Sequence, residues 1–144
     1  MMERRNESSL AERAGSPGAS TAPMVLVIED DPDICATLTD VLGDEGYRVH
    51  VMHTALGTLG EIERLHPAAI LLDLALPYRS GAALLMDLKT APATASIPVI
   101  VVSAYLDTLS PERAALATTL LGKPFEVPDL LAAVQGAGGP PRAA

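Results

Sequence analysis

The sequence predicts an α/β fold, in which helices cover both faces of a parallel β-sheet. Two observations predict it. Short apolar runs alternate along the chain with longer segments of helical periodicity, as in repeated strand–helix units. The runs 24–28, 69–72 and 99–102 are continuously apolar, with no alternation with polar residues, which is typical of strands buried on both faces of a sheet. With 144 residues, 49% of them hydrophobic, the chain is large enough for one domain with its own core.

The first strand and the first helix begin the alternation. The strand, predicted near 24–29, is an apolar run that ends in acidic residues. The helix, predicted near 32–43, is indicated by apolar residues at helical spacing, namely Ile34, Leu38, Val41 and Leu42. Asp31 or Asp33 can cap this helix, with Pro32 near its first position.

The remaining strands and helices follow in turn. Strands are predicted near 47–52, 69–73, 99–103 and 119–122. Helices are predicted near 55–65, 80–90, 110–117 and 127–135. Gly57 and Gly60 each weaken the second helix by about 1 kcal/mol relative to alanine. Ser80 is the expected cap of the third helix.

Both ends of the chain are expected to lie outside the folded domain, which spans 24–135. Residues 1–23 are polar and contain Gly15-Ser16-Pro17-Gly18, so they are expected to form a disordered leader. The tail, 136–144, contains Gly138-Gly139-Pro140-Pro141 and is expected to be flexible.

Four of the predicted strands end in polar or charged residues. The first strand runs into Glu29 and Asp30, and the third runs into Asp73. The fourth strand ends at Ser103, and the fifth runs into Lys123. The carboxyl ends of parallel strands meet at one edge of the sheet, where ligands bind in open α/β folds. We therefore expect these five side chains to converge.

Converging carboxylates constrain the chemistry of this edge. Like charges in a small pocket repel and raise each other's pKa, and a divalent cation removes that conflict. Hard oxygen ligands in a partly hydrated site suit Mg²⁺ or Mn²⁺. Glu29, Asp30 and Asp73 are therefore candidate residues for binding such an ion.

Four segments of the chain resemble the receiver domain of two-component response regulators. They are 25–31, Leu71-Leu72-Asp73-Leu74-Ala75-Leu76-Pro77, 97–104 and Gly122-Lys123-Pro124-Phe125. The resemblance covers residues 24–135. It implies a flavodoxin-like, doubly wound fold of five strand–helix units, with the strand order 2-1-3-4-5 and helices on both faces.

The resemblance also implies a role for each candidate residue. Asp73 is the phosphoacceptor, Lys123 is the catalytic cation and Ser103 is the switch hydroxyl. The implied metal ligands are Asp30, Asp73 and the backbone carbonyl of Ala75, with Glu29 acting through a water molecule.

The chain departs from the family pattern near the surface that usually carries the output. Ser103 and Lys123 are 20 residues apart, fewer than is usual, so the fourth helix or its loop is expected to be short. Leu120 stands where the family commonly has an aromatic residue that moves with the switch hydroxyl. Tyr105 is the nearest aromatic residue to Ser103 in the sequence. It is expected either to gate the pocket, setting the lifetime of the acyl phosphate, or to be an exposed loop residue beside it.

The implied function is that of a phosphorylatable switch rather than an enzyme. A histidine kinase or a histidine phosphotransfer protein would donate the phosphoryl group, and an unidentified downstream protein would receive the signal. The short ends of the chain predict a stand-alone receiver without an effector domain. The face formed by the fourth helix, the fifth strand and the fifth helix is a candidate homodimer surface.

Two other functions are weighed against this one. A pseudo-receiver would bind a partner without being phosphorylated; Leu120 and the short fourth helix leave this open, although the intact set of site residues argues against it. An aspartyl-phosphate phosphohydrolase of the haloacid dehalogenase type would also use an aspartate, Mg²⁺ and a lysine. Such enzymes usually carry a second aspartate two residues after the nucleophile, where this chain has Ala75.

Composition argues against several other classes. The net charge is −8, and seven acidic residues against one arginine lie between Met24 and Met52, which disfavours a direct nucleic-acid surface. No apolar run is long enough to span a membrane and the N-terminus lacks a signal-peptide core, so a cytoplasmic location is expected. The single cysteine, Cys35, is expected to be a small core residue, and the three histidines lack the spacing of metal ligands.

Overall fold

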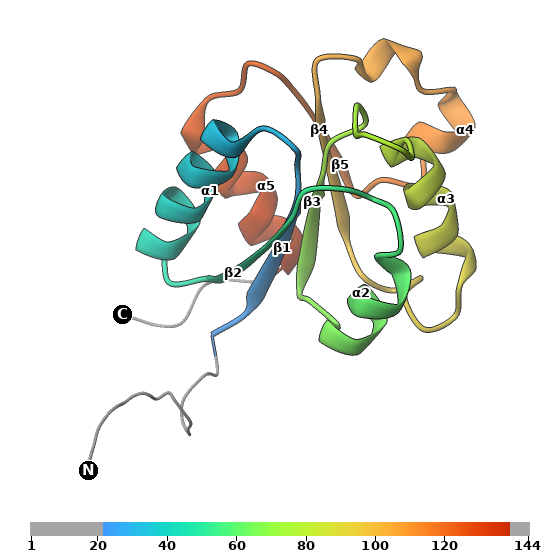
Figure 1. Cartoon of the computed structure of the whole chain (residues 1–144). Helices are drawn as coiled ribbons and strands as arrows, with labels where there is room; N and C mark the ends of the chain where they lie inside the picture. The colour runs from blue at the N-terminus through green and yellow to red at the C-terminus, as the bar shows by residue number, and fades with distance from the viewer. Residues whose placement is uncertain (1–21, 139–144) are drawn as a thin grey trace.

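Within residues 22–138, which the computed structural model describes, five parallel strands form one sheet in the order β2-β1-β3-β4-β5 (Figure 1). The strands are β1 Met24–Ile28, β2 Arg48–Met52, β3 Ala69–Leu72, β4 Val99–Ser103 and β5 Thr119–Gly122. The helices are α1 Pro32–Asp44, α2 Leu59–Leu65, α3 Gly81–Thr90, α4 Pro111–Ala114 and α5 Val127–Gly138, with a 3₁₀ turn, η1, at Leu106–Thr108. This topology confirms the predicted doubly wound fold.

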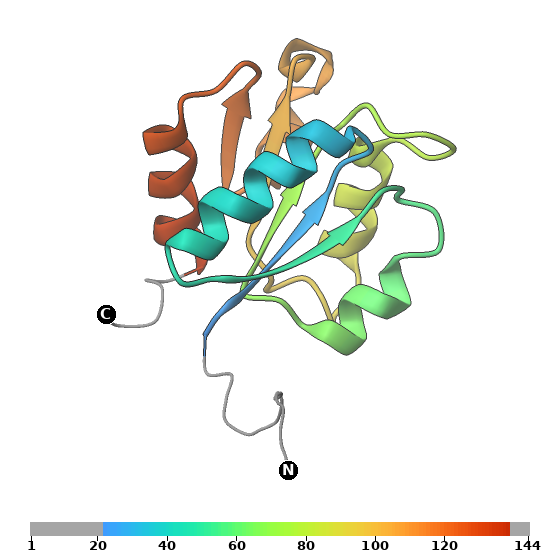
Figure 2. The same cartoon turned by 60° about the vertical axis from the view of Figure 1, so that its left-hand side comes forward.

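Helices cover both faces of the sheet, as the wholly apolar strands β1 and β3 require. The helices α1 and α5 lie on one face, and α2, α3 and α4 lie on the other (Figures 1 and 2). Alternate residues of β1 point into two hydrophobic cores, one on each face of the sheet. Val25 and Val27 pack with α1 and α5, whereas Leu26 and Ile28 pack with α2 and α3. Cys35 is buried in the first of these cores, as predicted.

Side chains cap the helices that follow the first and third strands. The Asp31 carboxylate accepts hydrogen bonds from the backbone N–H groups of Asp33 at 2.9 Å and Ile34 at 3.3 Å, so Asp31 rather than Asp33 is the cap of α1. Ser80 Oγ accepts from the backbone N–H of Ala83 at 3.1 Å, which confirms the predicted cap of α3. Because Asp31 and Ser80 cap these helices, Glu29, Asp30 and Asp73, which directly follow the strands, are not used as helix caps.

Three helices differ in extent from the predictions. The second helix, predicted from residue 55, begins at Leu59, because Gly57 adopts φ +69° and the chain turns before it. The fourth, predicted over 110–117, is α-helical only at Pro111–Ala114. The fifth continues past the predicted end at 135, because Ala137 packs against the core and holds the last turn in place.

The predicted termini are described only in part. Of the leader expected over 1–23, only Ala22 and Pro23 are described, and Ala22 is buried. Of the tail expected over 136–144, the first three residues belong to α5 and the rest lie outside the described residues. Among the helices of residues 22–138, none combines the length and the apolar character needed to cross a bilayer.

Candidate functional site

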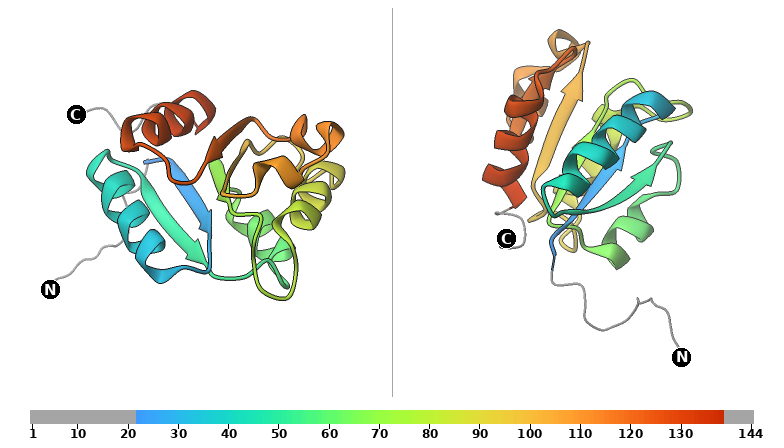
Figure 3. Two further views of the ribbon diagram at one scale, coloured as in Figure 1. Left: turned by 90° about the horizontal axis from the view of Figure 1, so that it is seen from above. Right: turned by 90° about the vertical axis from the view of Figure 1, so that its left-hand side faces the viewer.

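The carboxyl ends of four neighbouring strands meet at one edge of the sheet (Figure 3). The strand register brings their last residues level: Ile28 pairs with Leu72, and Ser103 pairs with Gly122. The ladder continues one residue further, since the backbone N–H of Asp73 donates to the carbonyl of Ile28 at 3.1 Å. Residues that follow β1, β3 and β5 are therefore delivered to one place, together with the last residue of β4.

Three carboxylates converge at this edge. Glu29, Asp30 and Asp73 each offer one carboxylate oxygen, and these three atoms lie within 4.8 Å of one another. Glu29 and Asp73 are buried, with 4% and 6% of their surface exposed, whereas Asp30 is exposed. Two buried anions so close together require a compensating positive charge.

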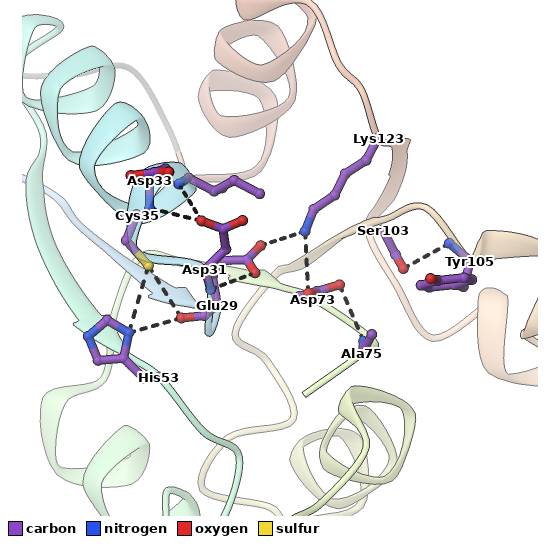
Figure 4. A network of polar contacts seen from close by, with 11 residues as sticks. Glu29, Asp31, Asp33, Cys35, His53, Asp73, Ala75, Ser103, Tyr105 and Lys123 are labelled. Atoms are coloured by element: carbon purple, nitrogen blue, oxygen red, sulfur yellow. Dashed lines mark hydrogen bonds and ion pairs between the residues drawn. The ribbon is translucent and has the colours of Figure 1, made fainter. Parts of the chain in front are cut away.

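Lys123 supplies a positive charge to both buried carboxylates (Figure 4). Its Nζ donates a hydrogen bond to Glu29 Oε1 at 2.6 Å and lies 3.3 Å from Asp73 Oδ2. Burial alone would lower the pKa of Lys123, but the hydrogen bond to Glu29 and the charges of Asp73 and Glu29 outweigh it and raise that pKa. The lysine is therefore a permanent cation within this site at neutral pH.

Glu29 stays poorly compensated despite this lysine. Burial raises the pKa of Glu29; the hydrogen bond from Lys123 opposes the shift and the charge of Asp73 adds to it. Its other oxygen, Oε2, accepts from the backbone N–H of Asp31 at 3.3 Å. A second cation beside Glu29 and Asp73 would relieve the remaining cost of two buried negative charges.

The oxygen donors at this edge fit a small, hard cation. Three carboxylates gather there, and the exposed Ala75 follows Asp73 by two residues. Such a set of oxygen donors, with room for water on the exposed side at Asp30, is typical of a protein-bound Mg²⁺ or Mn²⁺. The donor chemistry therefore agrees with the predicted metal.

The backbone around Asp73 is tightly packed. Asp73 Oδ1 accepts from the backbone N–H of Ala75 at 3.3 Å, and the N–H of Gly81 donates to the carbonyl of Leu74 at 2.9 Å. A Cβ atom at Gly81 would lie only 2.0 Å from the backbone oxygen of Asp73. Gly81 is therefore required for the chain to pass beside the candidate phosphoacceptor, a contact that the sequence pattern did not predict.

Two further side chains hold the backbone of Glu29 and were given no role by sequence reasoning. The Cys35 thiol donates to the carbonyl oxygen of Glu29 at 3.3 Å, and His53 Nδ1 lies 3.1 Å from the same oxygen. These contacts come from α1 and from the loop after β2, so they depend on tertiary packing. They fix the main chain from which the Glu29 side chain extends.

Ser103 and Tyr105 lie beside the carboxylates. Ser103 is buried, and its Oγ accepts from the backbone N–H of Tyr105 at 3.0 Å (Figure 4). Tyr105 is 56% exposed and lines a pocket of about 390 Å³ together with Leu74, Ala75 and Thr108. Leu120 lies apart from that pocket's lining: it pairs with Val101 within the sheet and is 40% exposed.

Comparison with known proteins agrees with this geometry. Residues 25–135 match the family model of the response regulator receiver domain. The chain is 30% identical over 115 residues to protein Rrf1 of Nitratidesulfovibrio vulgaris, across 78% of this chain and 80% of Rrf1. It is 31% identical to the DNA-binding response regulator MtrA of Mycolicibacterium smegmatis, across 77% of this chain but only 48% of MtrA.

Solved structures show the same fold. A sensor protein from Polaromonas sp. JS666 superposes with a TM-score of 0.73 at 30% identity, covering 80% of this chain and 94% of that one. The receiver domain of the sensor histidine kinase PA1611 from Pseudomonas aeruginosa also has a TM-score of 0.73, at 25% identity, covering 83% and 99%. That structure has a magnesium ion coordinated in its active site cleft. This chain belongs to the response regulator receiver domain family of two-component systems.

Proposed function

We propose that this receiver domain is switched by phosphorylation of Asp73. A histidine kinase or a histidine phosphotransfer protein would supply the phosphoryl group, in the cytoplasm, and the switched surface would act on another protein. The observation that carries the proposal is the convergence of Glu29, Asp30 and Asp73 within 4.8 Å, with the Lys123 ammonium against two of them. Burying such a cluster of charges lowers the stability of the fold, and clusters of this kind are typical of binding and catalytic sites.

The residues present fit a magnesium ion, and we propose how they would hold it. Asp30, Asp73 and the backbone carbonyl of Ala75 would bind it directly, and Glu29 would act through a water molecule. When bound, Mg²⁺ neutralises negative charge on the carboxylates and on the oxygens of an incoming phosphoryl group. The magnesium in the cleft of the PA1611 receiver domain supports this assignment.

The protein's own groups can then carry the transfer. A carboxylate oxygen of Asp73 would form the new bond to phosphorus while the bond from phosphorus to the donor nitrogen breaks and the histidine leaves. Lys123, held as a cation by its carboxylate partners, would compensate the charge of the transferred group. The burial of Asp73 limits access of water to the acyl phosphate that forms.

Ser103 and the segment after it are the proposed switch. The Ser103 hydroxyl holds the backbone of Tyr105, so a hydrogen bond from this hydroxyl to a phosphoryl oxygen would alter the η1 segment. Tyr105, at the mouth of the neighbouring pocket, would control access of water to the phosphorylated site. Leu120 would respond to the same shift, and the face of α4, β5 and α5 would carry the output or a homodimer contact.

An intact-mass experiment tests the proposed function. The protein is incubated with phosphoramidate or acetyl phosphate and Mg²⁺, and we expect the mass of one phosphoryl group to be added. The adduct should be absent in Asp73→Asn and after removal of the metal with EDTA. Asp40→Asn, which changes an exposed carboxylate on α1, is the matched control and should be phosphorylated normally. An adduct that persists in Asp73→Asn would refute the assignment.

A phosphorylation-independent binding module is the second candidate. The four-residue α4 favours it, because little ordered helix is available on the face that would report the switch. This candidate predicts no adduct and no turnover of phosphate esters. Catalytic turnover of a phosphate ester without a stable adduct would instead indicate a phosphohydrolase.

A further inference from the structure

A second pocket lies at the opposite edge of the sheet from Asp73, at the lower end of the strands in Figure 1. Its volume is about 350 Å³, within the range of small-molecule sites. Four segments of chain form it: Pro23 and Met24, Arg48, the end of α2 with its connection to β3 (Leu65 to Ala68), and the approach to β4 from Ser96 to Pro98. It shares no lining residue with the carboxylate cluster.

The lining combines apolar walls with a cationic group. Met24, Leu65 and Ile97 are among the apolar residues, whereas Arg48, His66 and Ser96 are the polar ones. Within the described part of the chain, this lining contains no acidic residue. In a protein of net charge −8, a pocket lined by the Arg48 guanidinium and no acidic residue is a local site of opposite sign, which favours an anion.

The cationic wall is fixed in place. Arg48 Nε donates to the carbonyl of Ala22 at 3.0 Å, and the Arg48 backbone N–H donates to the carbonyl of Pro23, also at 3.0 Å. Among the described residues, the terminal Nη groups of Arg48 have no hydrogen-bond partner. A guanidinium that is anchored through Nε, and whose Nη atoms bind no other residue of 22–138, is suited to bind a carboxylate or a phosphate.

The opposite wall is held by a lysine. Lys89 Nζ donates to the carbonyl oxygens of Ala95 at 3.2 Å and Ile97 at 2.6 Å, so it fixes the backbone on both sides of Ser96. The floor is tied to β1, because the backbone N–H of Ala68 donates to the carbonyl of Met24 at 2.8 Å. The pocket is therefore largely preformed, which reduces the entropy lost when a ligand binds.

His66 lines the pocket from a strained backbone position. It ends α2 in the left-handed region, at φ 45° and ψ 61°, where glycine is usual. A residue with a Cβ atom costs about 1 kcal/mol at such a position. Strain of this kind is often retained where a side chain serves binding, and here the side chain is an imidazole on the pocket wall.

We propose that this pocket binds a small organic anion, with one carboxylate or phosphate group on an apolar body. The anionic group would pair with Arg48 and contact His66 and Ser96, and the apolar body would lie against Met24, Leu65 and Ile97. This site does not depend on phosphorylation of Asp73, because its residues and its edge of the sheet are different.

The test is an NMR titration of the full chain in metal-free buffer, which keeps phosphate from binding at the carboxylate cluster through a metal. The probes are phenyl phosphate, benzoate, inorganic phosphate and benzyl alcohol. Phenyl phosphate or benzoate should shift the amide signals of Met24, Arg48, Ala68 and Ile97. Inorganic phosphate, which lacks the apolar body, should bind more weakly, and benzyl alcohol, which lacks the charge, should not bind. Whichever of phenyl phosphate and benzoate binds more tightly identifies the preferred anionic group.

Two variants and a control make the titration decisive. Arg48→Gln should weaken binding about tenfold, because a charge-assisted hydrogen bond is lost. His66→Gly suits the left-handed backbone, so it should fold at least as stably while binding more weakly. Arg64→Gln changes an exposed arginine on α2 and should bind like the parent protein. No shift at these amides with millimolar probe, or a shift unchanged by Arg48→Gln, would overturn the proposal.

Discussion

Lys123 donates a 2.6 Å hydrogen bond to Glu29 although 94 residues separate them in the chain. The bond joins the residue after β1 to the residue after β5, across the ends of the two intervening strands, β3 and β4. Because the same ammonium lies 3.3 Å from Asp73, one cation compensates two buried anions. Lys123 therefore supplies part of the positive charge that a metal ion would otherwise provide. The ammonium and a bound metal ion would compete for the same carboxylates, Glu29 and Asp73.

Replacing Lys123 with methionine should separate metal binding from phosphoryl transfer. Removing one positive charge leaves the carboxylates more negative, so the affinity for Mg²⁺ should rise several-fold. Phosphorylation by phosphoramidate should become much slower, because the charge of the transferred group is no longer compensated. The free energy of unfolding without metal should fall by roughly 2 kcal/mol. Titration calorimetry, intact mass and urea unfolding measure these three quantities.

Lys89→Met is the matched control for that experiment. Lys89 is also partly buried, but it donates to backbone carbonyls far from the carboxylates. This variant should lose stability while keeping the parent affinity for Mg²⁺ and the parent rate of phosphorylation. If Lys123→Met instead bound Mg²⁺ more weakly, the proposed competition between the two cations would be wrong.

Glu29 should make the stability of the metal-free protein depend on pH. Burial raises its pKa above the ordinary value of 4.5, so the folded protein binds this proton more tightly than the unfolded chain does. The contribution of Glu29 to the free energy of unfolding is therefore greatest below pH 4.5 and falls as the pH rises through the raised pKa. Urea unfolding of the parent and of Glu29→Gln, compared from pH 4.5 towards neutrality, measures this contribution as a difference.

The parent's stability relative to Glu29→Gln should decrease across that range. Glu63→Gln, which changes an exposed glutamate on α2, is the matched control variant for the same series. Saturating Mg²⁺ should remove most of the decrease at neutral pH, because the metal favours the charged carboxylates. If the parent instead became more stable relative to Glu29→Gln as the pH rises, the pKa of Glu29 in the folded protein would be lowered rather than raised, and this prediction would be wrong.

Gly81→Ala should impair the site through the backbone of Asp73. The new methyl group would overlap the Asp73 carbonyl oxygen, so this strand end or the start of α3 must move, at a cost of about 1–3 kcal/mol. Phosphorylation should slow at saturating Mg²⁺ even at temperatures where circular dichroism shows a folded protein. Gly60→Ala is the control: nothing lies within 4 Å of its Cβ position, so it should stabilise α2 slightly and leave phosphorylation unchanged. Equal rates for the two variants would contradict the positioning role of Gly81.

The sequence was sufficient to predict the strands and the convergence of the charged residues. Wholly apolar runs identify doubly covered strands, and parallel strands deliver the residues after them to one edge, so Glu29, Asp30, Asp73 and Lys123 could be grouped without coordinates. The cap at Ser80 could also be predicted, because it depends on residues within one turn.

Features that depend on tertiary packing could not be predicted. The start of α2 depends on the left-handed backbone of Gly57, and the end of α5 depends on Ala137 packing against the core. The approach of Gly81 to Asp73 depends on the path of a loop, and the contact of His53 with the Glu29 carbonyl joins two strand ends. In each case the feature depends either on a contact with a residue distant in sequence or on a backbone conformation that the neighbouring residues do not predict.

Tyr105→Ala should shorten the lifetime of the phosphorylated protein. Tyr105 lines the pocket beside Ala75, and removing its ring would open that pocket to water. We expect dephosphorylation, followed by intact mass after removal of the phosphodonor, to be several-fold faster. Tyr78→Ala removes an 87% exposed ring that does not line this pocket and should leave the rate unchanged. Unchanged kinetics in Tyr105→Ala would assign this residue to the exposed surface alone.

A crystal structure of the protein with Mg²⁺ and beryllofluoride, which mimics a phosphoryl group on an aspartate, tests the central claim most directly. The account predicts one Mg²⁺ bound by the carboxylates of Asp30 and Asp73 and the carbonyl of Ala75, with beryllofluoride on Asp73 and Lys123 against a fluoride. A magnesium ion bound away from these residues, or beryllofluoride attached to a different carboxylate, would contradict it.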